Sequence, residues 1–561
     1  MPAATVTIAN GATWQEVATD RQRHRDATIA EVSPPVPGLR QEDIPLNSTG
    51  VPKLLLTEQE IEITSMDVEN LVKKIASGEW SSTVVTNAFL RRAGLAQKLT
   101  NSITELLPKR ALNKAAELDQ YLAANKKPMG PLHGIPISVK EHIKIKGEDV
   151  NAGFVAWVGQ VAEEDALIVQ CLERAGAVIY ARTTQPQTLM QIETDNNLYG
   201  ITVNPYNTTL SAGGSSGGEG ALIALRGSIL GIGTDIGGSI RVPAASNGLF
   251  GFKPTTQRLP TAGSVHAMPN AESILGTPGP ISTSLEGLHL FTKSILDQKP
   301  WVQQSDLVGF DWRDPAQYYL DRKFRVGVLY GDGVVRPHPP VLKALDEFVG
   351  KLQKSPNVEV VEWKPWKHDL AWSIIAKLYY PDGGAEVKAL VESSGEPWRP
   401  LMSFILHENS HVKAHTIQTL WEAISERDAY RTAYNKLWDE QPVDVILSPA
   451  GPGVATKHGT GRYWAYTSQW NLLDYPVIVF PTKEAVKEGV LGEKYEYPAD
   501  YKPLNETDRY MYGLWKEHGA KGYKDAPISL QIVGRRFDDE KLFRATRILL
   551  EEAGLPAAVS A

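Results

Sequence analysis

Apolar and polar positions along the chain change their pattern near residue 130. Before that point, apolar side chains recur at helical spacing, which predicts helices over 14–29, near 57, near 65, over 84–93 and over 111–123. After it, short apolar runs alternate with helical segments. These runs predict strands at 134–140, 177–180, 229–232, 443–447, 477–480 and 528–533, with helices at 166–175, 220–225 and 539–553. The alternation favours an α/β fold with a largely parallel sheet.

The first sixty residues are interpreted as an N-terminal arm that carries the helix over 14–29. The segment Ser33–Gly38 contains three prolines and a glycine and breaks regular structure there. No internal repeat or low-complexity linker interrupts the rest of the chain. We therefore expect a single domain over 61–555, with a variable region at about 265–425.

The charge balance and the cysteine count exclude several classes of protein. The 561 residues carry 58 Lys and Arg against 65 Asp and Glu, a net charge of -7, which argues against a nucleic-acid-binding protein. Cys171 is the single cysteine, so no intrachain disulfide forms and nothing marks an oxidising compartment. Residues 1–10 lack a secretory signal, and no apolar run is long enough to span a membrane. A cytoplasmic location is predicted.

The most unusual segment is rich in glycine and serine and covers residues 211–245. It contains two clusters, Gly213–Gly218 and Gly237–Ser239. Glycine loses much conformational entropy on folding, so such density usually marks tight turns or a close approach of the backbone to a ligand. The helix over 220–225 and the strand over 229–232 would return the chain so that both clusters meet at one site.

Residues of this kind suggest nucleophilic catalysis. A serine between glycines presents its hydroxyl without steric cover, and the main-chain N–H groups of 236–239 could converge on one oxygen as an oxyanion hole. The serine needs a base. Lys140 ends an apolar strand, where burial would lower the pKa of its amine. By residue type alone, a surface lysine and an ordinary glycine-rich turn or phosphate-binding loop are the more common interpretations.

Several longer motifs resemble the amidase signature family over residues 55–555. They are GPLHGIPISVKE (130–141), TDNNLYGITVNPYN (194–207), GGSSGGEGAL (213–222), GTDIGGSIRVPAA (233–245), GLFGFKPT (248–255) and PISLQIVG (527–534). An ordered set of this length is far more specific than one short motif. The segments GGEGALIALRG and ETDNN are most similar to the fungal acetamidase or general amidase branch.

The resemblance implies a fold, a reaction and a set of roles. The fold is a large mixed, mostly parallel central sheet covered by helices on both faces. The reaction is hydrolysis of a small-molecule amide, with no cofactor and no metal, and a homodimer is compatible with it. Lys140 matches the base, Ser215 the bridging serine in a cis peptide, and Ser239 the nucleophile that forms the acyl-enzyme. Further matches are Ile236, Gly237 and Gly238 in the oxyanion hole, Leu189 and Gln191 against the acyl group, and Ser216, Thr234, Asp235 and Arg241 as supporting residues.

Substrate specificity is expected to come from the variable region, and its aromatic residues are candidates for a pocket wall, although each is as readily explained by core packing. These candidates, with three from beyond the region, are Trp312, Tyr318, Tyr319, Tyr379, Tyr380, Trp398, Trp464, Tyr466 and Trp470.

Four alternative functions remain open at this stage. The same triad would hydrolyse esters or carbamates. Gly213-x-Ser215-x-Gly217 also fits the nucleophile elbow of α/β-hydrolases, with His458 or His518 as the base. His407-Glu408-x-x-His411 fits the zinc-binding helix of metallohydrolases. A subunit of an amidotransferase belongs to the same family, but that enzyme usually has serine where this chain has Glu219.

Overall fold

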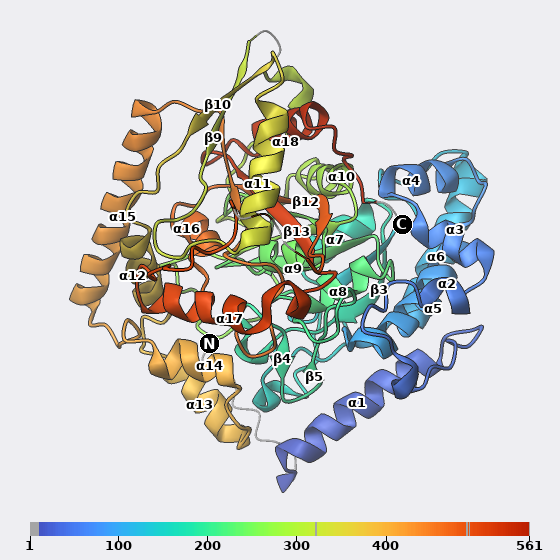
Figure 1. The fold of residues 1–561 in the computed structure, drawn as a ribbon. Coiled ribbons are helices and arrows are strands. Elements are labelled where there is room, and N and C mark those ends of the chain that lie inside the picture. Colours follow the sequence, from blue (N-terminus) through green and yellow to red (C-terminus); the bar gives the residue numbers. More distant parts are fainter. Residues whose placement is uncertain (1–10, 320–321, 490–491, 493, 560–561) are drawn as a thin grey trace.

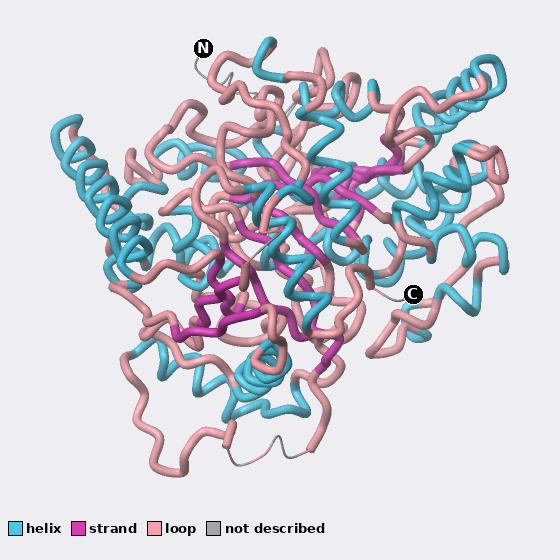
Figure 2. Tube along the Cα trace, turned by 90° about the horizontal axis from the view of Figure 1, so that it is seen from above, coloured by secondary structure: helices cyan, strands magenta, loops and turns pink. Residues whose placement is uncertain are grey.

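The computed structural model describes residues 11–319, 322–489, 492 and 494–559. Residues 1–10, on which the absence of a secretory signal was predicted, lie outside this set. A sheet of 11 strands crosses the middle of the molecule, with helices around it (Figures 1 and 2). In order from one edge to the other, the strands are β1 (Ile103–Leu106), β3 (Val178–Thr183), β2 (Pro136–Lys140), β6 (Leu230–Asp235), β8 (Thr277–Ser282), β7 (Phe250–Lys253), β12 (Val477–Ala485), β13 (Pro527–Val533), β11 (Val445–Pro449), β9 (Phe324–Val328) and β10 (Val358–Glu362).

The large mixed sheet confirms the predicted α/β fold, but its strand directions require a correction. Strands β3, β2 and β6 run parallel, as do β11, β9 and β10. Between these two blocks, from β6 through β8, β7, β12 and β13 to β11, every neighbouring pair is antiparallel, and so is β1 with β3. The sheet is therefore not mostly parallel. Alternation of helix and strand predicts parallel crossovers, yet no α-helix separates β7 from β8, and β12 and β13 are antiparallel although α17 joins them.

Helices cover both faces of the sheet. On one face α10, α11 and α18 pack against β8, β12 and β13, and on the other α8 and α9 pack against β6, β7 and β12, with α5 behind them. The α-helices are α1 (Trp14–Ala30), α2 (Pro52–Leu55), α3 (Glu58–Ser65), α4 (Val68–Ala76), α5 (Ser82–Thr100), α6 (Pro108–Asn125), α7 (Leu167–Arg174), α8 (Gly217–Ala224), α9 (Arg241–Ser246), α10 (Leu285–Leu296), α11 (Pro339–Leu352), α12 (His368–Tyr379), α13 (Ala385–Ser394), α14 (Pro400–Ser403), α15 (Ile417–Glu440), α16 (Ala465–Leu472), α17 (Glu506–Gly522) and α18 (Asp539–Glu552).

The parallel neighbours β2 and β6 bring the two motif regions together. Ser138 pairs with Gly231 and Val139 with Ile232, so the carboxyl ends of both strands lie side by side. Every residue of β2 is buried, as expected for a strand with a neighbour on each side and helices above and below. The carboxyl ends of parallel strands are the usual place for ligand sites in α/β sheets.

The N-terminal helix α1 lies along the outside of the molecule, at the lower right of Figure 1, and packs against β1. It begins with a capping box, in which Thr13 and Glu16 each accept a main-chain N–H of the other. Leu106 donates its N–H to Thr28 Oγ1 at 3.1 Å, which attaches the helix to β1. The division into an arm and one domain stays a prediction. None of the helices in the described ranges combines the length and the apolar character that crossing a membrane requires.

Candidate active site

Lys140 ends β2 in a fully buried position. Its Nζ lies 2.6 Å from Ser215 Oγ and 3.1 Å from Thr234 Oγ1. Burial lowers the pKa of Lys140 to about 7, although the charges of Asp235 and Glu219 act in the opposite direction. The neutral amine is therefore well populated near pH 7, and it can accept a proton from the serine hydroxyl.

Sequence reasoning missed His142, which is linked to this amine through Thr234. Nδ1 of His142 lies 2.8 Å from the carbonyl oxygen of Val265, which can only accept, so Nδ1 carries the ring proton. Nε2 then accepts from Thr234 Oγ1 at 2.9 Å. With its own proton used in this way, Thr234 accepts from Lys140. The lone pair of the neutral amine is left to face Ser215.

The pKa of His142 is lowered well below its usual value, first by burial and then by the charge of Lys140, which keeps the ring neutral. The one sequence signal for this residue was its place two positions after Lys140 at the end of a buried strand.

Glu219, in the first turn of α8, is a buried acid near Lys140. Burial raises the pKa of Glu219 to about 8, although hydrogen bonds from Ser138 and Thr183 oppose the shift. Their hydroxyl oxygens lie 2.5 and 2.8 Å from the carboxyl oxygens. A protonated, hydrogen-bonded acid can occupy this buried position without forming an ion pair with the lysine.

The two serine loops are joined through their main chains. The peptide bond between Gly214 and Ser215 is cis, as the family resemblance implies. Ser216 donates its main-chain N–H to the carbonyl oxygen of Ser239 at 3.1 Å. Ser215 and Ser239 are both buried, and each is followed within two residues by the start of a helix, α8 and α9 respectively. The structure thus brings the two predicted serine clusters to one place.

Asp235 anchors the loop that carries Ser239. Its carboxylate accepts the N–H groups of Gly238 at 2.9 Å and Ile240 at 3.1 Å. Arg241 binds the same carboxylate with two hydrogen bonds of 3.0 and 2.9 Å, and Asn471 donates a fifth hydrogen bond to it at 2.9 Å. Burial alone would raise the pKa of Asp235, but the Arg241 charge and these hydrogen bonds outweigh it and hold the pKa below its usual range. The carboxylate is ionised.

The predicted oxyanion hole differs at one of its donors. Because the Gly238 N–H already points to Asp235, it is not available to a substrate oxygen. No acceptor within the described residues pairs with the N–H groups of Ile236, Gly237 or Ser239. Gly238 has φ +136°, and an added Cβ would lie 2.4 Å from Thr467 Oγ1, so the position requires glycine. We therefore expect three donors rather than four.

The two residues predicted to contact the acyl group lie in different surroundings. Leu189 packs on the same apolar cluster as Ile236, Tyr379 and Trp464. Gln191 is buried and donates to the carbonyl oxygen of Gln187 at 3.3 Å, within its own loop. Leu189 therefore belongs to the apolar cluster that also contains Ile236 of the oxyanion loop, while the Gln191 amide is tied to the loop that carries it.

The aromatic candidates include residues that border the oxyanion loop and residues that pack in the core. An added Cβ at Gly237 would lie 2.7 Å from Tyr379 Oη and 3.3 Å from Trp464 Cε3, so these two rings border the loop directly. Trp312 packs against Phe543 of α18 with ring centroids 5.4 Å apart, in the opposite helical layer. Core packing accounts for Trp312, as it does for Tyr380 and Trp470, which are buried in the apolar cluster.

The structural requirements of two alternative functions are not met. The nucleophile elbow needs a strand directly before Ser215, but residues 212–214 form a loop, and the Ser215 hydroxyl faces Lys140. His458 contacts Thr208 instead. The zinc motif needs one helix under both histidines, but the helix ends at Glu408 before the chain reaches His411.

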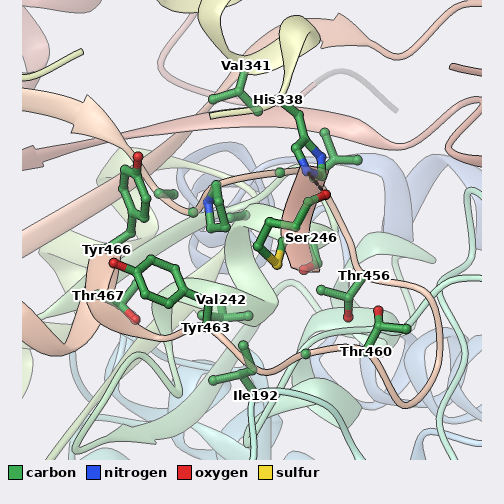
Figure 3. A pocket seen from close by; sticks show the side chains of 18 of the residues that line it. Ile192, Val242, Ser246, His338, Val341, Thr456, Thr460, Tyr463, Tyr466 and Thr467 are labelled. Atoms are coloured by element: carbon green, nitrogen blue, oxygen red, sulfur yellow. Dashed lines mark hydrogen bonds between the residues drawn. The ribbon is translucent and has the colours of Figure 1, made fainter. Parts of the chain in front are cut away.

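A pocket adjoins the oxyanion loop without containing the predicted triad. Val242, Trp464 and Thr467 form part of its wall, and Lys140, Ser215 and Ser239 are absent from its lining. In Figure 3, His338 lies across the pocket from Ile192. The pocket thus shares a wall with the oxyanion loop but is separate from the reactive side chains.

Comparison with known proteins identifies the class. The Amidase family model matches residues 84–543. An acetamidase of Emericella nidulans is 39% identical over 96% of this chain and 98% of its own length. An acetamidase of Aspergillus oryzae is 37% identical over 94% and 97%. The solved structure of a fatty acid amide hydrolase superposes with a TM-score of 0.90 at 33% identity, covering 97% of this chain and 96% of that one.

The chain belongs to the amidase family, as the motifs indicated, and it is an amide-hydrolysing enzyme. Its similarity to the two fungal acetamidases agrees with the branch that the sequence motifs predicted.

Proposed function

We propose that the protein hydrolyses carboxylic acid amides through an acyl-enzyme on Ser239, with Ser215 as the proton bridge and Lys140 as the base. The observation that carries the proposal is the 2.6 Å contact between Ser215 Oγ and the Nζ of a fully buried lysine. Burial lowers the pKa of that amine to about 7, so a substantial fraction of it is neutral near pH 7, and a serine nucleophile needs such a base.

In the first half of the reaction, Lys140 takes the proton of Ser215, and Ser215 takes the proton of Ser239. Oγ of Ser239 attacks the amide carbonyl carbon, and the carbonyl π electrons move onto its oxygen. The N–H groups of Ile236, Gly237 and Ser239 stabilise that negative charge. The proton returns along the same path to the leaving nitrogen as the C–N bond breaks.

In the second half, water gives a proton to the same relay and attacks the acyl carbon. The bond to Ser239 Oγ breaks, the oxygen regains its proton, and the carboxylic acid leaves. Ammonia or an amine is the other product. The triad itself does not distinguish amides from esters or carbamates, so substrate choice depends on the residues around it.

The test is a panel of amides, esters and carbamates with graded acyl length, run with the wild type and with Ser239→Ala. Removing the nucleophile should lower amide turnover by about 10⁴-fold or more. Ser246→Ala is a matched control at the far end of α9, where we expect activity close to the wild type. Hydroxylamine should trap the acyl group from the wild type as a hydroxamate. Amide turnover retained by Ser239→Ala would refute the proposal, and esters as the only substrates would change the substrate class.

A further inference from the structure

The loop from Ile236 to Ile240 is held one peptide group at a time. A trans peptide is planar, and its C=O and N–H point in opposite directions, so a contact at one end also orients the other. The Gly237–Gly238 peptide is held at both ends, because Thr467 Oγ1 donates to its C=O at 2.7 Å and its N–H donates to Asp235. This peptide cannot rotate without losing two hydrogen bonds.

The next peptides are oriented in the same way. The C=O of Gly238 accepts from the N–H of Val242 at 2.7 Å, which orients the N–H of Ser239. The C=O of Ser239 accepts from Ser216, while the N–H of Ile240 donates to Asp235. The N–H of Ser239 is thus a free donor on a peptide that the first turn of α9 fixes.

The N–H of Gly237, which belongs to the Ile236–Gly237 peptide, is a second donor without an acceptor among the described residues. The carbonyl at the other end fixes the orientation of this peptide. Its C=O accepts from Tyr379 Oη at 3.0 Å. Across the described part of the chain, this hydroxyl is the one donor to that carbonyl. Thus the orientation of the Gly237 N–H depends on a single side chain, which lies 143 residues away in sequence.

Tyr379 is well placed for this task. It is the last residue of α12 and is buried, with its ring centroid 6.1 Å from that of Trp464. Burial raises the pKa of Tyr379 well above its usual value, so the hydroxyl keeps its proton and donates. The Tyr379 hydroxyl and the Trp464 ring lie so close over Gly237 that a side chain at this position would not fit between them.

We propose that Tyr379 is a positioning residue, which orients the Gly237 N–H toward the substrate oxygen by binding the carbonyl of Ile236. This inference rests on the proposed function, because it assumes an oxyanion at this loop. Without the hydroxyl, this part-buried carbonyl has no donor among the described residues, which favours rotation of the peptide. The Gly237 N–H then contributes less to the transition state, while the substrate ground state is little affected.

The experiment compares Tyr379→Phe with Tyr380→Phe. Both changes remove one buried tyrosine hydroxyl, but the Tyr380 hydroxyl contacts no polar group among the residues described. For Tyr379→Phe we expect kcat to fall roughly tenfold, less than the loss of a whole oxyanion donor, with KM changed less than about twofold. Tyr380→Phe should keep the wild-type kcat, and circular dichroism melts should show both variants folded.

A second readout separates positioning from a general structural effect. An aldehyde with the acyl chain of the fastest amide in the panel forms a tetrahedral adduct on Ser239 and places an oxyanion in the hole. Tyr379→Phe should weaken the aldehyde by the same factor as kcat/KM and leave the affinity for the matching carboxylate unchanged. Equal losses in both variants, or an unchanged aldehyde affinity, would overturn the inference. If Ser239→Ala stays active, the proposed function fails instead.

Discussion

The base and the oxyanion loop lie side by side but are built from different parts of the chain. Lys140, Ser215 and Thr234 come from β2, the loop before α8 and β6, respectively, all inside the motif regions. The oxyanion loop is held from α12 and α16, by Tyr379 and Thr467 among others, 143 and 230 residues away from the groups they contact. Proton transfer therefore depends on residues inside the sequence motifs, whereas charge stabilisation depends in addition on side chains from distant helices.

Among the variants that test this comparison, Asp235→Asn is expected to have the largest effect on stability and activity, because it removes the anchor of the oxyanion loop. The buried Arg241 would lose its charged partner, and such changes cost about 3–5 kcal/mol of unfolding free energy. Activity should fall by about a hundredfold or more because the loop loses its shape. Urea unfolding and kcat/KM measure the two effects.

Asp439→Asn serves as the control, since its ion pair with Arg535 lies at the surface. Such pairs contribute about 1 kcal/mol or less. If Asp235→Asn cost no more stability than this control, the anchor role would be wrong.

The pH profile of the wild type tests the base side. The pKa of Lys140 is lowered from its usual 10.5 to about 7, so the amine is protonated below pH 7 and neutral above it. We expect kcat for a slowly cleaved amide to drop about tenfold per pH unit below pH 6 and to level off above pH 8. A flat profile from pH 5 to 9 would contradict a lysine base.

Glu219 also titrates in this range, so Glu219→Gln is the control for the pH profile. The acidic limb should persist in that variant. Its disappearance would assign the titration to the carboxyl group instead of the amine.

The smallest effect is expected from Thr467→Val, and it sharpens the difference between the two held peptides. The Gly237 carbonyl would lose its hydroxyl donor, but Asp235 still holds the N–H end of the same peptide. We expect kcat to fall about two- to threefold, less than for Tyr379→Phe, because one end remains held. Thr467→Ser should behave as the wild type. A larger loss than in Tyr379→Phe would show that the peptide-by-peptide account is mistaken.

The residues around the base could be predicted from the sequence more completely than the residues that hold the oxyanion loop. Lys140 and the serine clusters stand in ordered motifs, and the expected strands over 134–140 and 229–232 are neighbours in the sheet. Tyr379 could be named only as one aromatic residue among many, because its contact depends on how α12 packs over the loop. The directions of the central strands were missed for a related reason: pairing between distant segments leaves no local pattern.

The place of β12 in the sheet has a consequence for synthesis of the protein. This strand pairs with β7 near the active site, and α16, which supplies Thr467 and Asn471, immediately precedes it. On the ribosome, Ser239 and Lys140 are made long before these partners emerge. The nascent chain therefore carries all three reactive side chains well before the helix and strand that support the oxyanion loop have been translated.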